Sequence, residues 1–160
     1  MTRMTDLLHN SKSVVAVTPQ VVAVAGEVTG EIIDTQGFYS IMLETILGAV
    51  ATSKVKITSI KESDESDMAN ATDVTDAQIF GLAKNVDIDT VKTIGKTQIL
   101  PSKRYVQVKL TTTTEDAIAG AVAVLIGADV DGNINAQGWK QSVEQYARVG
   151  YAIIDKDIAG

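Results

Sequence analysis

Apolar and polar residues alternate with a period of two along much of this chain. The clearest case is the run of residues 104–111, where Val106, Val108 and Leu110 fall on one side of an extended backbone. Such alternation is typical of a strand with one buried face and one exposed face. Residues 54–60 alternate in the same way, with Ser59 expected on the buried side.

Three further runs are richer in apolar residues. Residues 38–47 are rich in apolar residues and predict a more buried strand, and residues 119–126 are apolar on both faces, which favours a strand in the interior of a sheet. Residues 13–25 are rich in valine but contain Pro19, which has no N–H to donate to a neighbouring strand. We therefore expect Pro19 at a sheet edge or at a corner between two strands.

Glycine-containing turn signals separate these runs, and residues 31–35 and 90–99 are weaker strand candidates. Several short strands divided by turns predict an all-β protein, either an antiparallel β-sandwich or a jelly-roll-like barrel. The acidic, polar segment 62–73 is expected to be a surface loop.

The two ends of the chain differ from this pattern. We expect an N-terminal arm over residues 1–12, a sandwich domain over 13–129 and a C-terminal arm over 130–160 with a short helix. The only Trp and two of the four Tyr follow the last strand, and Trp139, Val143 and Tyr146 share one face of a helix. The arm either packs on another molecule or folds back over its own sheet.

Composition removes several classes of site. The 160 residues make one domain, and they include no Cys and one His. Disulfides, Cys-ligated zinc, iron–sulfur clusters and sites with two histidines are therefore excluded. A net charge of −6 disfavours binding to nucleic acid. No apolar run reaches the roughly 20 residues of a membrane span, and no secretory signal is recognisable.

Motifs that suggest chemistry fail in detail. Residues 95–97 (GKT) resemble the end of a phosphate-binding loop, but Thr90 stands where that motif requires Gly. Residues 129–133 begin like a calcium loop, but Ile134 and Lys140 occupy the positions of its Gly and Glu. We expect no catalytic residue, no metal site and no cofactor, and thus not an enzyme, although carboxylate chemistry is not excluded by spacing alone.

An ordered set of short segments resembles a known group of proteins. Residues 33–39 read IDTQGFY, 61–65 read KESDE, 73–74 read DV and 103–108 read KRYVQV. The order is similar to that in small β-sandwich proteins encoded among the head genes of tailed bacteriophages, which carry IDTxGY, QESDD, W-x-DV and KRYVRV. This chain departs from them in having Lys61 in place of Gln and no Trp before residues 73–74.

The resemblance implies a capsid cement (decoration) protein on the virion surface, made in the host cytoplasm. Its partners would be the major capsid protein and further copies of itself in a homotrimer. A cement protein binds through apolar anchors. The candidate contact residues, all in or near the arms, are Leu7, Leu8, Val14, Val15, Trp139, Tyr146 and Tyr151. Two alternatives stay open: a ligand- or carbohydrate-binding sandwich, and a head–tail or tail structural protein.

Overall fold

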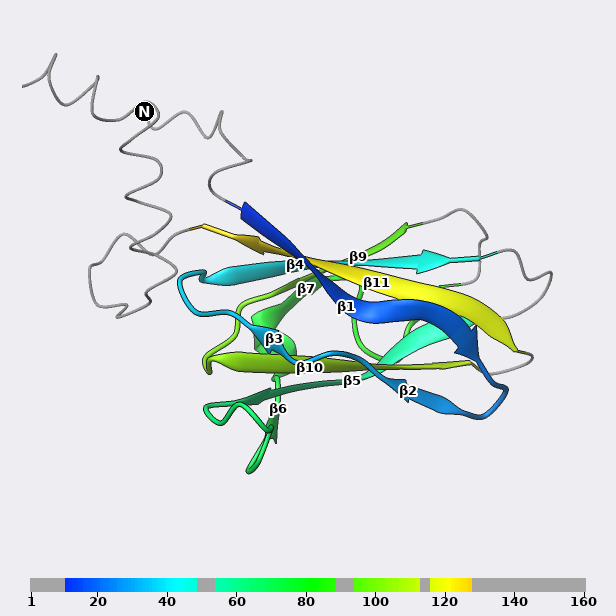
Figure 1. Ribbon diagram of the computed structural model, residues 1–160. Coiled ribbons are helices and arrows are strands. Elements are labelled where there is room, and N and C mark those ends of the chain that lie inside the picture. Colours follow the sequence, from blue (N-terminus) through cyan, green and yellow to red (C-terminus); the bar gives the residue numbers. More distant parts are fainter. Residues whose placement is uncertain (1–10, 49–53, 89–93, 113–115, 128–160) are drawn as a thin grey trace, which may run out of the picture.

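The computed structural model describes residues 11–48, 54–88, 94–112 and 116–127. These residues form two antiparallel β-sheets that face each other as a sandwich, as the sequence predicts (Figure 1). The elements in chain order are β1 (Ser11–Val22), β2 (Glu27–Thr29), β3 (Ile33–Asp34), β4 (Ser40–Leu47), β5 (Val55–Ser63), β6 (Thr72–Asp73), the 3₁₀ helix η1 (Asp76–Gln78), β7 (Ile79–Gly81), β8 (Asp87–Ile88), β9 (Ile94–Ile99), β10 (Tyr105–Thr112) and β11 (Ala117–Ile126).

One sheet, sheet A, has the strand order β1-β11-β4-β9-β7. The other, sheet B, has the order β2-β10-β5-β6, and in addition β3 pairs with β10 and β8 with β5. The two weaker strand candidates contain β3 and β9, and residues 90–93 of the second candidate lie outside the described residues. β1 begins at Ser11, so the last two residues of the predicted N-terminal arm belong to sheet A. The predicted C-terminal arm, residues 130–160, lies outside the described residues.

The alternation of β10 has the predicted meaning, since Val106, Val108 and Leu110 are fully buried between the sheets. In β5 the alternation changes phase. A bulge shifts the pairing between Lys109 and Leu110 of β10, and the buried residue of β5 after Ile57 is therefore Ile60. The expectation that Ser59 continues the buried face is wrong, because a bulge inserts one extra residue and reverses the side on which later residues lie.

β11 is an interior strand between β1 and β4, as predicted. Its inner face is made almost entirely of small residues, which are Ala117, Ala119, Ala121 and Ala123. Larger side chains such as Ile118 and Val122 point to the outer face of sheet A. The strand is thus apolar on both sides, but only the inner side faces the other sheet.

Pro19 lies where its chemistry requires. β1 is an edge strand of sheet A, and its pairing with β11 is interrupted between Val17 and Gln20. Pro19 falls inside this interruption and packs over Gly120, where an added Cβ would come within 2.9 Å of the proline ring. The prediction that Pro19 occupies a sheet edge is confirmed.

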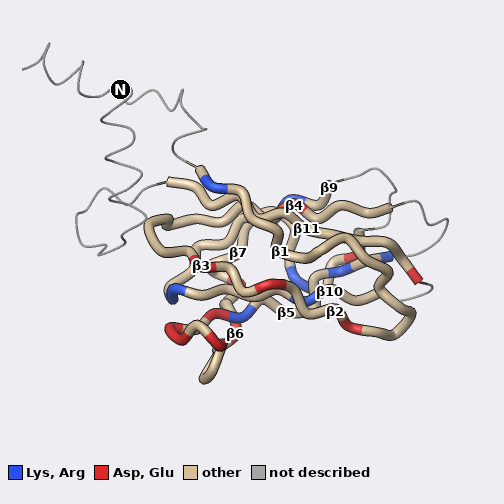
Figure 2. The backbone as a smooth tube through the Cα atoms, in the orientation of Figure 1, with Lys and Arg blue, Asp and Glu red and all other residues tan. Residues whose placement is uncertain are grey.

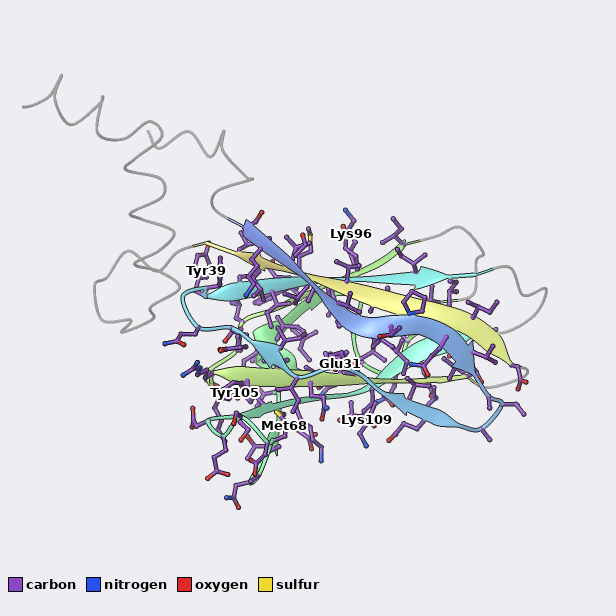
Figure 3. The ribbon with its side chains drawn as sticks, viewed as in Figure 1. Glu31, Tyr39, Met68, Lys96, Tyr105 and Lys109 are labelled. Atoms are coloured by element: carbon purple, nitrogen blue, oxygen red, sulfur yellow. The ribbon has the colours of Figure 1, made fainter. Side chains whose placement is uncertain are left out.

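The link between β2 and β3 joins the two sheets along one side. The Gly30 N–H donates to the Val108 carbonyl of sheet B at 2.8 Å. The next residue, Glu31, donates its N–H to the Ala16 carbonyl of sheet A, also at 2.8 Å. Glu31 therefore lies between the layers (Figure 3), and the sandwich is closed by backbone hydrogen bonds on this side.

Candidate functional site

Three connections meet at one end of the sandwich. The strands run so that the β3–β4, β5–β6 and β9–β10 connections all emerge there, at the left in Figure 1. We call this end, comprising residues 34–39, 62–71 and 100–105, the loop end. Tyr39 and Tyr105 both lie at it (Figure 3).

Glu62 ties two of these connections together. Its side chain belongs to β5, and only 4% of the residue is exposed. The carboxylate accepts hydrogen bonds from the Ser102 N–H at 2.8 Å, the Ser102 hydroxyl at 2.7 Å and the Lys103 N–H at 3.3 Å. A buried carboxylate is tolerated when donors surround it in this way. The prediction of a surface loop starting at residue 62 is therefore wrong for Glu62 and Ser63, which are buried.

Asp34 and Arg104 form a second tie. The Arg104 Nε and Nη2 atoms donate to the two Asp34 carboxylate oxygens at 2.9 and 2.8 Å, a bidentate geometry. The Thr35 hydroxyl donates to the Arg104 carbonyl at 2.7 Å. The Arg104 guanidinium also lies 4.9 Å from the centre of the Tyr105 ring, within the range of a cation–π contact. Loops separated by 70 positions in sequence are thereby fixed to each other.

Hydrogen bonds from the Arg104 side chain hold the pKa of Asp34 below its ordinary value, against the opposing effect of partial burial. A carboxylate with a lowered folded-state pKa adds stability above its ordinary pKa, and that stability is lost as the pH falls through the folded-state value. We expect Asp34→Asn to lower the unfolding free energy by less than about 1 kcal/mol at neutral pH, because the pair is half exposed and screened by solvent.

The check is thermal unfolding of both proteins from pH 8 down to about pH 2.5. The difference between them is expected to be constant above pH 5 and to shrink below about pH 4, near the ordinary Asp pKa. A difference that grew on acidification would contradict the sign derived from Asp34. Asp64→Asn, at an exposed position of the same end, serves as the control.

The β5–β6 connection is held by its own side chains. The Ser63 hydroxyl donates to the Ala69 carbonyl at 2.6 Å and accepts from the Glu65 N–H at 3.1 Å. Asp67 accepts from the Ala69 N–H at 2.9 Å. Within the described ranges, no three His, Cys, Asp or Glu side chains converge as metal ligands would. The acidic residues here shape the loop.

Both ends of the described chain lie beside the loop end. Ser11 of β1 pairs with Ile126 of β11, and the Tyr39 N–H donates to the Gly127 carbonyl at 3.2 Å. Gly127 has φ +73°, and an added Cβ there would overlap the Tyr39 ring. Ser11 and Gly127, at the two ends of the described chain, therefore lie at one corner of the sandwich, next to Tyr39.

The structure separates the two predicted contact residues that it describes. Val14 is partly buried and packs against the core. Val15 is half exposed on the outer face of sheet A. The other five, Leu7, Leu8, Trp139, Tyr146 and Tyr151, lie outside the described residues.

The outer faces of the two sheets differ in chemistry. On sheet A, half-exposed apolar side chains come from β1, β4, β9 and β11, and Glu44 and Lys96 form an ion pair at 3.2 Å. On sheet B the outward residues of β5 and β10 include Lys56, Lys61 and Lys109. Figure 2 shows this concentration of charge on sheet B, and in Figure 3 Lys96 and Lys109 point in opposite directions.

The outer face of sheet A is hollowed where two glycines lie. A depression of about 280 Å³ is bordered by Val15, Pro19, Ile46 and Ile118, with Gly120 beneath it and Gly48 beside it. The Pro19 ring packs over Gly120 on one side of this depression, and the half-exposed side chains of Val15, Ile46 and Ile118 stand around it. We call this depression the Gly120 hollow.

The segment that resembles a phosphate-binding loop is part of a strand. Gly95, Lys96 and Thr97 belong to β9 and pair with β4 without interruption. Gly95 leaves room for the Ile88 side chain, since a Cβ at Gly95 would lie 2.6 Å from the Cδ1 atom of Ile88. Residues 95–97 are therefore structural, but they form a regular part of a strand and not the strand turn or bulge that their sequence suggests.

No helix among the described residues is long and apolar enough to cross a membrane. No protein-family model matches the chain, and no curated protein matches its sequence. The segments 33–39, 61–65 and 103–108, which lie far apart in the sequence, are brought together at the loop end by Glu62 and by the Asp34–Arg104 pair. No local sequence signal marks this grouping, because the partners are 40 and 70 positions apart.

Proposed function

We propose that this protein is a capsid cement (decoration) protein of a tailed bacteriophage, which binds the outer surface of the head shell and stabilises the junctions between its subunits. One observation carries the proposal. The three segments that resemble phage head proteins form a single, hydrogen-bonded unit at the loop end. These hydrogen-bonded side chains hold the loops in one conformation. Such a surface suits binding, because a preorganised surface loses little entropy when it binds.

The loop end also presents suitable anchors. Tyr39 is half exposed there, and at the same end Arg104 lies over the Tyr105 ring. Tyrosine and arginine dominate the binding energy of many protein interfaces. Because the chain leaves the sandwich at this corner, the N-terminal residues Leu7 and Leu8 are within reach of the same surface. The loop end is therefore the side proposed to face the shell.

The proposed partners are the major capsid protein and, through closed symmetry, two further copies of this chain. The direct experiment is to purify virions or empty heads and to measure this chain against the major capsid protein by mass spectrometry. We expect a ratio near one to one or a simple fraction of it. A few copies per particle would favour a connector or tail protein, and absence from particles would contradict the proposal and favour a free ligand-binding sandwich.

We expect Tyr39→Ser to weaken binding to heads that lack this protein by about tenfold or more, the effect of losing an interface anchor of about 1.4 kcal/mol. The measurement is cosedimentation with such heads over a range of protein concentrations. Val24→Ser is the matched control, because Val24 is 50% exposed against 51% for Tyr39 but lies at the opposite end of the sandwich. Equal losses in both variants would contradict the assignment of the loop end.

A further inference from the structure

We infer that the outer face of sheet A is covered by the C-terminal segment 139–151 of the same chain, with Trp139 in the Gly120 hollow. The starting observation is that this face is apolar and uncovered in the described part of the protein. Val15, Ile46 and Ile118 each remain about half exposed around the hollow. A sheet face of this kind is stabilised by burial against another element.

The size of the hollow indicates what fills it. Its volume of about 280 Å³ lies just below the roughly 300 Å³ at which pockets begin to hold small-molecule ligands. Its borders are valine, proline and isoleucine, which offer no hydrogen bond to orient a polar ligand. One large aromatic side chain is the occupant that matches both the volume and the lining.

The C-terminal segment has the complementary pattern. The sequence predicts a short helix over residues 139–149, which would place Trp139, Val143 and Tyr146 on one side. Lys140, Glu144 and Arg148, spaced four apart, fall on the other side. Such a helix has one apolar stripe that needs a partner, and its charged side is suited to water.

The connection is long enough for the segment to return to its own sheet. Gly120 and Gly127 are separated by about 23 Å along the strand, at 3.3 Å per residue. Residues 128–138 span up to roughly 36 Å when extended, so Trp139 reaches the hollow with slack. A short linker of this kind gives an effective concentration in the millimolar range, which favours the chain's own segment over that of another copy.

The chain contains a single Trp, so its fluorescence reports on Trp139 alone. In the full-length protein we expect a blue-shifted emission maximum, protection from iodide quenching, and no change of either on dilution. Ile46→Lys places a charge at the border of the hollow. We expect it to red-shift the emission and to raise the iodide quenching constant several-fold.

Phe80→Lys is the matched control. Phe80 is 49% exposed and Ile46 is 47% exposed, both on the outer face of sheet A, but Phe80 belongs to the far edge strand β7 and does not border the hollow. We expect its emission to match that of the unaltered protein. Far-ultraviolet circular dichroism and the melting temperature establish that both variants are folded.

Three results would overturn the inference. One is a Trp emission typical of full exposure in the unaltered protein. The second is a blue-shifted emission that both lysine variants leave unchanged, which would place Trp139 elsewhere. The third is protection that disappears on dilution together with a loss of molecular mass by light scattering, which would assign the hollow to the segment of a second copy.

Discussion

Glu62→Ala is expected to lower the free energy of unfolding by about 3 kcal/mol, because it removes a buried carboxylate and leaves its donors without an acceptor. The two N–H groups and the hydroxyl that lose their partner belong to Ser102 and Lys103. For a protein of this size, such a loss lowers the melting temperature by roughly 10 °C. Urea unfolding followed by circular dichroism measures the change directly.

Two further variants test the cause. Glu62→Gln keeps the shape and one acceptor oxygen, so it is expected to lose less stability than Glu62→Ala. Asp64→Ala removes an exposed carboxylate two residues away and is expected to change the unfolding free energy by less than about 0.5 kcal/mol. If Glu62→Ala unfolded like Asp64→Ala, the carboxylate would not be holding the β9–β10 connection.

Gly30→Ala is expected to destabilise the protein by about 3 kcal/mol, at the upper end of the range for overpacking. The added Cβ would lie 2.2 Å from the Ala16 carbonyl oxygen and 3.0 Å from that of Val108. Both atoms are backbone held in hydrogen bonds, to Glu31 and to Gly30 itself. Since neither can rotate away as a flexible side chain would, the two sheets must separate locally.

The measurement is again urea unfolding, combined with hydrogen exchange at the backbone amides of residues 30 and 31. We expect both amides to exchange faster in the variant. Thr29→Ala, at the exposed neighbouring position in β2, is the control and should leave stability and exchange nearly unchanged. Unaltered exchange at Glu31 in Gly30→Ala would mean that the link tolerates a side chain after all.

The sequence predicted the all-β fold because burial on one face leaves a period of two, as in β10. The predicted alternation failed at the bulge in β5, because the residues around Ser59 carry no local signal that the register changes opposite Lys109. Glu62 was misinterpreted for a related reason. A carboxylate in an acidic run reads as solvated, and its burial depends on Ser102, 40 positions away.

The sequence predicted the position of β11 within its sheet, but not the exposure of its outer face. Residues 119–126 are apolar on both sides, which indicated an interior strand, and β11 is one. The pattern gave no sign that the outer side would remain half exposed, as at Ile118. Apolar residues on both sides of a strand indicate an interior position in its sheet, but they do not show whether another layer covers each face.

The pairing of β1 with β11 also constrains how the protein is made. Of the strands that the structure describes, β1 is the first to be synthesised, and its partner β11, paired with it from Ser11↔Ile126 to Val22↔Ala117, is the last. At ribosomal speeds of about 5–20 residues per second, roughly 100 residues of delay correspond to ~5–20 s. During that interval a valine-rich strand waits unpaired while the chain grows. Lys12 and Pro19 within it disfavour association with other nascent strands, so they protect the chain before the sandwich exists.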